Sequence, residues 1–296
     1  MTNALLAALV LSSLLHAAWN LAARRWRHLP GFVPAACCWG WLWAVALLPL
    51  SAPHLSWTLP TLGWAGVSSV GLAIYLFCLN RAYAEGDISV AYPIIRSSPL
   101  WVSLVSVTFL GEHLSAAAWF GILLTLFGVT ALPLRHFSLH EIAALWAGRR
   151  GAFLFFALGA SLGTVIYTLS DNMAMVHAQG PLAGAAFSVL LFPPALLLWR
   201  WASPEAFRGI DWKRLTPPGL PCRYGALFGL CIFAAYALVV GALIFGDPGR
   251  VLAVTNLGVV LGALGGIVFF HERTGLLPRL AGLALTVAGI TLLRLF

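Results

Sequence analysis

Charged side chains are scarce in this chain. Only 9% of its 296 residues are Asp, Glu, Lys or Arg, whereas 61% are hydrophobic. A soluble domain carries about 25% charged residues, so a surface this poor in charge is expected to face lipid. A hydrocarbon core about 30 Å thick needs roughly 20 apolar residues per helix. Ten such helices with short links use nearly the whole chain and leave no room for a separate soluble domain.

Sequence patterns for metal binding, ATP hydrolysis and disulfide frameworks are also missing. The five cysteines are odd in number and form neither a C-x-x-C pair nor a zinc-ligand spacing, so we interpret them as packing residues. No Walker motif is present, and His271-Glu272 lacks the second histidine of H-E-x-x-H. The nine acids are scattered along the chain. We therefore predict no enzymatic activity, no cofactor and no metal.

The N-terminus lacks the positive segment of a cleavable signal peptide. No Lys or Arg precedes Leu21, whereas Arg24, Arg25 and Arg27 follow the apolar run. This order is the reverse of a signal peptide, so we interpret the run as a first membrane span.

Ten apolar runs predict an all-α integral membrane protein with ten transmembrane helices. We expect the spans at 3–22, 32–50, 61–83, 88–110, 115–134, 151–171, 181–200, 224–245, 249–270 and 276–296. The third and the seventh are the weakest of these patterns. Pro193 and Pro194 lie inside the seventh, where neighbouring helices or water can satisfy the backbone groups that they free.

The net charge of +8 comes from residues in the links between the spans. Links after odd-numbered spans hold fourteen Lys and Arg residues; the even-numbered links and the two tails hold Arg250 and Arg294, and Arg96 lies within a span. Such a bias is typical of membrane orientation and argues against nucleic-acid binding. We expect odd-numbered links to be cytoplasmic, both termini to lie outside, and the protein to reside in the cytoplasmic (inner) membrane.

The two halves of the chain repeat one another. Each contains an Asp, a Glu twenty-five residues later and then two glycines seven apart, namely Asp87, Glu112, Gly121 and Gly128, and then Asp247, Glu272, Gly282 and Gly289. Because each half has five spans, an odd number, the halves must be inverted in the membrane. Inverted repeats are typical of secondary transporters, with the substrate site near the midplane. We predict repeats at 1–135 and 151–296 joined by a cytoplasmic linker at 136–150.

Small residues predict close helix packing. Four pairs of glycines are spaced as G-x-x-x-G: Gly159 and Gly163, Gly225 and Gly229, Gly258 and Gly262, and Gly262 and Gly266.

The sequence GEHLS at Gly111–Ser115, followed by Gly121 and Gly128, resembles the EamA domain of the drug/metabolite transporter superfamily. FHERTG at residues 270–275 resembles it less closely, and LLHAAWNLAAR at residues 14–24 is similar to a subset with H-A-x-W-N in the first helix. The resemblance covers nearly the whole chain as two tandem domains. It implies a ten-helix secondary transporter, often an exporter of amino acids or other small metabolites, similar to the YddG-type aromatic amino acid exporters.

Other members of the superfamily carry nucleotide sugars, triose phosphates or cationic drugs. Small multidrug-resistance relatives have an essential Glu in the first helix, whereas this chain has no acid before Glu85. That difference argues against proton-coupled export of cationic drugs by their mechanism. The two repeats supply the two halves that smaller relatives assemble by dimerising, so the sequence is compatible with a monomer.

Arg96 is a charged residue inside an apolar span. On a helix it shares a stripe about 80° wide with Ser89, Tyr92, Pro99 and Ser103. It lies roughly 12 Å along the helix from Ser89, and a charge near the bilayer centre costs at least about 2.5 kcal/mol. We therefore expect it to face a cavity or a partner. Its planar fork suits a carboxylate or a phosphate, so it either holds the anionic end of a substrate or locks the bundle structurally.

Pro93 and Pro99 flank this arginine. Each removes a helical hydrogen bond and can kink the helix. A broken helix near the midplane is a common transporter feature, and the prolines provide either a moving hinge or a static kink.

The first and sixth spans carry further polar stripes. In the first, His16, Trp19 and Asn20 lie on one face; His16 either couples protons or is a buried hydrogen-bonded histidine, and Trp19 faces either the cavity or the membrane interface. In the sixth, Tyr167 and Asp171 share a face, and Asp171 is either a solvated helix cap or the partner of a substrate ammonium or of Arg96.

The remaining site candidates come from four other spans. Asn256 aligns with Arg96 at the repeat offset of 160, which predicts one basic and one neutral polar group at equivalent depths. Trp101 lies nearly opposite Arg96 on an ideal helix, so it joins the site only if Pro99 rotates the following turn. The other candidates are Tyr75, Tyr83 and Tyr236.

Glu112 and Glu272 are expected to stabilise the helices that follow them through the helix dipole.

These features predict a secondary transporter that exports small metabolites, with amino acids, aromatic or neutral ones included, as the first candidates. The alternatives are phosphorylated or phosphonate cargo, a membrane enzyme acting on lipids, and a structural or sensory membrane protein. The expected partners are a small-molecule substrate and the lipid bilayer.

Overall fold

The fold consists of helices and their links. The computed structural model describes residues 2–26, 28–29, 31–85, 94–132, 134–136, 138, 141, 151–269 and 275–295. The helices are α1 (Asn3–Arg25), α2 (Phe32–Ser51), α3 (Leu59–Glu85), α5 (Ser98–Phe109), α6 (Ala116–Ala131), α8 (Gly151–Ala174), α9 (Ala183–Ala202), α10 (Cys222–Leu243), α11 (Pro248–Thr255), α12 (Leu257–Phe269) and α13 (Leu276–Leu295). Two short 3-10 helices follow α2 and α9, at Ala52–His54 and Pro204–Phe207.

The predicted spans correspond to these helices. Among the described residues, eight segments are long and apolar enough to cross a membrane, and α5 and α6 are shorter apolar helices. Spans one to three, five to eight and ten end within three residues of the prediction. The third and seventh are uninterrupted helices, and α9 contains Pro193 and Pro194. The protein is therefore an all-helical, multi-span membrane protein, as predicted.

The fourth and ninth spans are the exceptions to this continuity. Within the described part of the fourth, α5 begins at Ser98, after a turn at Arg96 and Ser97. The ninth is divided between α11 and α12 at Asn256. Residues 88–93 of the fourth span, with Tyr92 and Pro93, lie outside the described residues.

The most extensive helix interfaces join the first half of the chain to the second. α3 packs on α8, and the equivalent helices α10 and α1 pack on each other. In the same way, the packing of α10 on α2 is equivalent to the packing of α3 on α9. The packing of α12 on α1 is equivalent to the packing of α5 on α8. The pairs α2 with α9 and α6 with α13 join equivalent helices directly, and α5 also packs on α11, the first part of the ninth span. Exchanging the two halves thus converts each of these three matched pairs into its counterpart, as expected for inverted repeats. We propose that the repeats divide at residues 136–150.

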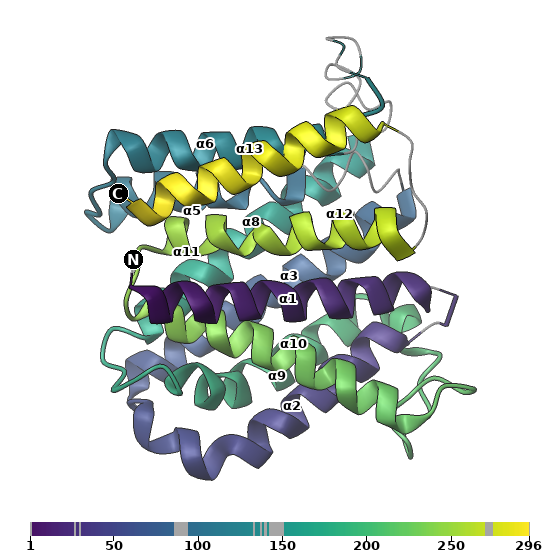
Figure 1. The fold of residues 1–296 in the computed structure, drawn as a ribbon. Coiled ribbons are helices and arrows are strands. Elements are labelled where there is room, and N and C mark those ends of the chain that lie inside the picture. Colours follow the sequence, from purple (N-terminus) through teal and green to yellow (C-terminus); the bar gives the residue numbers. More distant parts are fainter. Residues whose placement is uncertain are drawn as a thin grey trace.

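The predicted glycine pairs of the two repeats pack against each other. α6 and α13 lie side by side (Figure 1). A Cβ at Gly121 would lie 3.0 Å from the Gly289 carbonyl oxygen, and a Cβ at Gly128 would lie 2.7 Å from that of Gly282. Only glycine permits backbones to approach this closely.

The G-x-x-x-G pairs differ in how closely they approach neighbouring helices. A Cβ at Gly163 would lie 2.6 Å from Tyr75 N on α3, and a Cβ at Gly229 would lie 2.7 Å from Ala36 O on α2, so both permit close packing. No described atom lies within 4 Å of the Cβ position of Gly262, so within the described part of the chain the predicted close approach is wrong there.

The GEHLS segment is the turn between α5 and α6. Gly111 has φ 70°, a conformation that favours glycine, and the Ser115 hydroxyl accepts from Ala118 N (3.2 Å) as the N-cap of α6. The first turn of α6 contains no acid and Glu112 lies just before the N-cap, so the helix-dipole role of Glu112 stays a prediction. Its half-buried carboxyl lies near Asp247 and Arg250, which form an ion pair with each other (3.0 Å). Glu272 lies outside the described residues.

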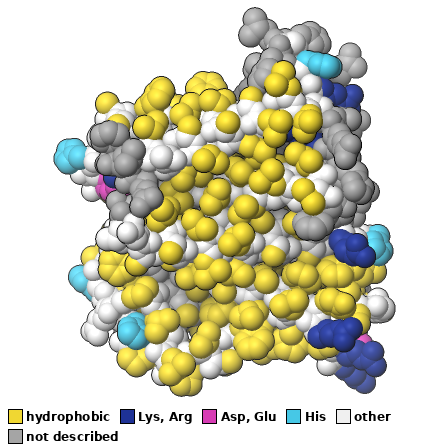
Figure 2. Space-filling view, viewed as in Figure 1, with side chains coloured by type: hydrophobic (Ala, Val, Ile, Leu, Met, Phe, Trp, Pro, Cys, Tyr) yellow, Lys and Arg dark blue, Asp and Glu magenta, His cyan; other side chains and the backbone are white. Residues whose placement is uncertain are grey.

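Odd-numbered and even-numbered links meet at opposite ends of the bundle. An ion pair of 3.4 Å joins Arg81, at the end of the third span, to Glu205, in the link after the seventh. At the other end Gln179 N donates to His54 O (2.8 Å), which joins the links after the sixth and second spans. The labelled termini lie together at the left of Figure 1, and Figure 2 shows an apolar belt with most Lys and Arg side chains at its right-hand end.

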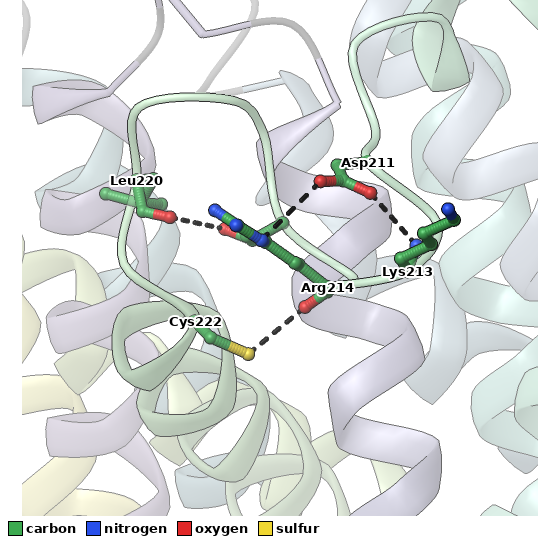
Figure 3. A network of polar contacts seen from close by, with 6 residues as sticks. Asp211, Lys213, Arg214, Leu220 and Cys222 are labelled. Atoms are coloured by element: carbon green, nitrogen blue, oxygen red, sulfur yellow. Dashed lines mark hydrogen bonds and ion pairs between the residues drawn. The ribbon is translucent and has the colours of Figure 1, made fainter.

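The link from α9 to α10 is held by its own polar contacts. Lys213 N donates to Asp211 Oδ1 (3.0 Å), Arg214 pairs with Asp211 (3.9 Å), and Cys222 Sγ donates to Arg214 O (3.1 Å) (Figure 3). These contacts make Asp211 an ordered carboxylate outside the membrane spans.

Candidate binding cavity at the helix breaks

Two interrupted helices from opposite halves meet at one place. At the first break Ser97 N donates to Ile94 O (3.2 Å), and at the second Asn256 N donates to Ala253 O (3.1 Å). Both are short-range bonds that replace the α-helical pattern. Arg96 and Asn256 occupy these breaks, and they are the pair that the repeat offset of 160 predicts. The break at Asn256 contains no proline, and its equivalence to Arg96 is the sequence signal that marks it.

A cavity of about 110 Å³ lies between these breaks and the middles of the surrounding helices. Its walls come from α1, α2, α3, α5, α8, α9, α10 and α11. Seven of the predicted site residues line it: His16, Trp19, Tyr75, Arg96, Tyr167, Tyr236 and Asn256. A single ordered water needs only about 10–15 Å³, so the cavity has room for a small ligand.

Arg96 lies at the cavity as predicted. Its side chain is partly exposed, whereas Asn256 is 2% exposed. The arginine charge acts electrostatically on His16 of α1 and on Tyr167 of α8. The permanent positive charge of Arg96 therefore acts on residues of two other helices that line the cavity.

Aromatic rings form a continuous row along one side. Ring centroids are 5.9 Å apart for Tyr75 and Tyr167, 6.5 Å for Tyr167 and Tyr236, and 5.9 Å for Tyr236 and Phe192. Their edge-to-face angles of 62–78° are a favoured arrangement for aromatic pairs. Phe192 was not predicted, because nothing distinguishes it in the sequence from other apolar residues of the seventh span.

His16 and Trp19 are joined within α1. Trp19 Nε1 donates to His16 Nδ1 (3.1 Å), and both residues line the cavity. Trp19 therefore belongs to the cavity and not to an interfacial aromatic belt. Asn20 does not line the cavity, because its side-chain amide donates to His16 O on the same helix (2.7 Å).

Asp171 lies behind the cavity wall. It is 1% exposed, and its two carboxylate oxygens accept from Ser68 Oγ (2.5 Å) and from Tyr236 OH (2.7 Å). The interpretation of Asp171 as a solvated helix cap is therefore wrong. Ser68 was not predicted; a serine facing inward from the third span carries no distinctive sequence pattern.

The remaining candidates lie elsewhere. Trp101 is 45% exposed and donates to Ser97 Oγ (3.1 Å), on the side of α5 away from the cavity, as ideal helix geometry predicts. Pro99 is buried in the first turn of α5. The side chain of Tyr83 is not among those described.

Comparisons with known proteins connect this arrangement to transport. Residues 3–132 match the EamA-like transporter family. The chain is 29% identical over 132 residues, 45% of its length, to a Pseudomonas fluorescens protein named probable 4-amino-4-deoxy-L-arabinose-phosphoundecaprenol flippase subunit ArnE, of which the match covers 95%.

A protein of known crystal structure shares the fold. It is 18% identical, and the superposition covers 100% of this chain and 99% of that protein with a TM-score of 0.68. At this identity the likeness shows the fold alone. The family match agrees with the resemblance carried by GEHLS and its glycines: residues 3–132, a little under half of the chain, are similar to the EamA-like transporter family.

Proposed function

We propose that this protein is a secondary transporter that binds a small zwitterionic metabolite in the cavity at the helix breaks, with amino acids as the first candidates, and exports it by alternating access. One observation carries the proposal. Arg96 and Asn256 interrupt equivalent helices of the two halves and line the same cavity. A ligand bound there would contact both halves, which is where inverted-repeat transporters hold their substrates.

The anionic end of such a substrate would lie at Arg96. A guanidinium presents a planar fork of donors that matches a carboxylate. The first turn of α5 starts at Ser98, which also lines the cavity, so the positive end of this helix dipole adds to the arginine charge. Both features favour a negative group at this end of the cavity.

Hydroxyl oxygens on α8 and α10 provide a place for an ammonium group. Thr164 Oγ1 donates to Ala160 O (3.1 Å) and Tyr236 OH donates to Asp171 (2.7 Å). Since a hydroxyl has one hydrogen and two lone pairs, both oxygens remain acceptors where they line the cavity. The cavity thus combines donors for a carboxylate with acceptors for an ammonium.

The rest of the wall suits a small apolar side chain. Tyr75, Tyr167 and Phe192 present rings, and Leu72 and Leu76 add aliphatic surface. An apolar cavity of about 150 Å³ accommodates benzene. The cavity of about 110 Å³ is smaller and therefore suits a compact ligand. Size and lining together favour a small amino acid over a lipid-linked sugar in this conformation.

Counterflow of labelled amino acids in proteoliposomes tests the proposal. We expect the wild type to exchange at least one amino acid, and Arg96→Ala to lower transport by about 10- to 150-fold, as expected from one lost charged hydrogen bond. Arg96→Lys should retain part of the activity, because a point charge replaces the fork.

Arg208→Ala is the matched control, because Arg208 is exposed in the link after α9. It should transport as the wild type does. Wild-type rates in folded Arg96→Ala would make Arg96 a structural residue and would refute its role as the carboxylate anchor.

Phosphorylated or phosphonate cargo is a second candidate. The similarity to a probable flippase subunit for a lipid-linked amino sugar favours it, and an arginine fork also suits a phosphate. Failure of the wild type to exchange any amino acid, with exchange of a labelled phosphonate or sugar phosphate, would select this candidate.

We propose no catalytic activity, because both the family and the curated relative are transport proteins by name. We also propose an inner-membrane location with odd-numbered links in the cytoplasm. Because the two halves bury their interfaces within one chain, we propose that the monomer is the transport unit. A dimer in light-scattering measurements of the purified protein would contradict that.

A further inference from the structure

Asp171 is a buried acid inside the helix bundle that the proposed binding of substrate does not use directly. Its carboxyl is 1% exposed and accepts from hydroxyls of two other helices, Ser68 on α3 and Tyr236 on α10. An ionisable group at this depth is energetically costly, and such groups often mark proton or ion pathways. The three hydrogen-bonded residues also join three helices that surround the cavity.

We propose that Asp171 is the binding site of a coupling proton, which reaches it from the cavity through the Tyr236 hydroxyl. The proposal rests on the proposed transport function and adds to it the chemical nature of the coupling ion. Burial disfavours the ionised carboxylate, whereas two hydroxyl donors favour it. Because these effects oppose each other, charge in the neighbouring cavity decides between the two forms.

Tyr236 is placed to relay the proton. Its ring lines the cavity and its hydroxyl donates to Asp171 Oδ2 (2.7 Å). A hydronium ion in the cavity transfers a proton to the Tyr236 oxygen as the hydroxyl hydrogen passes to Asp171. A water molecule and a neutral carboxylic acid result, and the tyrosine returns to its starting protonation state. Release follows the same steps in reverse.

The other titratable groups around the cavity have different roles. Tyr167 on the same helix, Tyr75 on α3 and Tyr236 on α10 ordinarily titrate near pH 10, and Arg96 stays charged. The Cys37 thiol on α2 also lines the cavity, and a thiol ordinarily titrates at about pH 8.5. His16 on α1 accepts at Nδ1 from Trp19. An indole N–H only donates, so this bond requires an unprotonated Nδ1 and a neutral imidazole. Asp171 is therefore the group near the cavity that we expect to exchange protons.

Substrate and proton compete at this site. A substrate ammonium that binds the Tyr236 oxygen places positive charge beside Asp171 and favours its ionised form. Binding of the zwitterion thus expels the proton, and proton binding expels the zwitterion. Mutual exclusion of this kind couples outward movement of substrate to inward movement of a proton.

The first test is accumulation of a labelled amino acid in proteoliposomes under a pH difference, with the membrane potential held at zero by potassium and valinomycin. For one proton per substrate, each pH unit supports about a tenfold accumulation ratio, since one unit is a tenfold change in proton activity. We expect the wild type to reach this ratio. Asp171→Asn should reach a ratio of about 1 while it still shows measurable counterflow, which needs no gradient.

Asp211→Asn is the matched control, because it makes the same chemical change in the link shown in Figure 3. It should accumulate substrate as the wild type does. Wild-type accumulation in Asp171→Asn would overturn the proposal. Counterflow without gradient-driven accumulation in the wild type would also overturn it and would leave the proposed function standing.

The second test does not depend on the cargo. Infrared spectra of the purified protein in lipid, labelled with 13C-aspartate, should show a protonated-carboxyl component that appears and disappears with pH, is lost in Asp171→Asn and is kept in Asp211→Asn. If no amino acid is transported, the proposed function fails and this titration still decides about Asp171. Identical pH-dependent bands in the wild type and in Asp171→Asn would refute proton binding at Asp171.

Discussion

Tyr236 connects the cavity to the interior of the bundle. Its ring is one of the aromatic rings of the wall, and its hydroxyl reaches the buried carboxylate of Asp171. The sequence marked both residues as candidates but not their contact, because they are 65 residues apart on different helices. Ser68 and Phe192 complete their surroundings and belong to residue types that occur throughout the apolar spans. A single polar residue in lipid is conspicuous in a sequence, whereas its apolar and hydroxyl neighbours are not.

Glu112 is a half-buried carboxyl with a testable effect on stability. Burial and the nearby Asp247 carboxylate raise its pKa above the ordinary value of 4.5. Below pH 4.5 the Glu112 carboxyl is protonated in both the folded and the unfolded state. As the pH rises above that value, the unfolded state loses the proton first, so the folded state becomes less stable relative to the unfolded state. Glu112→Gln should therefore raise the thermal midpoint at neutral pH. The free energy of unfolding should rise by at most about 1 kcal/mol, because solvent screens the charge. This gain should vanish below pH 4.5.

Glu205 provides a control of opposite sign. Hydrogen bonds from its own backbone amide and from Ser203 lower the pKa of this exposed carboxyl. Glu205→Gln should thus lower the thermal midpoint at neutral pH and have no effect in acid. A lower midpoint for Glu112→Gln at neutral pH would contradict the interpretation of Glu112.

At the scale of elements, the seam between α6 and α13 depends on glycine. A Cβ at Gly128 would lie 2.6 Å from Thr286 N and 2.7 Å from Gly282 O. Gly128→Ala should destabilise the protein by about 1–3 kcal/mol, because backbone atoms cannot move aside as a flexible side chain can. The measurement is the thermal midpoint of the purified variant.

Gly66 on α3 is the matched control for this prediction. Its Cβ position has nothing within 4 Å, so Gly66→Ala should be neutral or stabilise by about 0.5–1 kcal/mol through lower backbone entropy. Equal midpoints for the two variants would show that the seam tolerates a methyl group and would refute the packing argument.

The two helix breaks show how far element boundaries follow from sequence. Pro93 and Pro99 predicted the interruption at Arg96, because proline removes a backbone donor. The interruption at Asn256 has no such local cause and was marked only by the internal repeat. Whether the prolines act as a hinge stays a prediction.

For the whole molecule, the inverted repeat predicts that equivalent helices start on opposite sides of the membrane. α3 begins at Leu59, which is 84% exposed, and the equivalent helix α10 begins at the exposed Cys222. An impermeant thiol reagent should label Cys222 only from the cytoplasmic side, and Cys222→Ser should abolish this labelling. Leu59→Cys in the Cys222→Ser background should be labelled only from the outside.

Cys37, Cys78 and Cys231 are buried and should stay unreactive. Labelling of both positions from one side would refute the inversion of the repeats, and labelling from the two sides in reversed order would refute the predicted orientation alone.

The sequence by itself determined that the protein is an all-helical membrane protein of many spans, and it predicted the relation between the halves. Lipid as solvent requires long apolar helices and confines charge to their ends, so composition and spacing carry that information directly. It also singled out Arg96 and Asn256, because an isolated polar residue in an apolar span is rare.

The tertiary structure decided which of the candidates meet. It placed Tyr75, Tyr167 and Tyr236 on one wall of the cavity, whereas Asn20 and Trp101 do not line it. It also enclosed Asp171 between Ser68 and Tyr236. Those outcomes depend on how helices from the two halves cross, and crossing is set by glycine seams and side-chain packing between residues far apart in the chain.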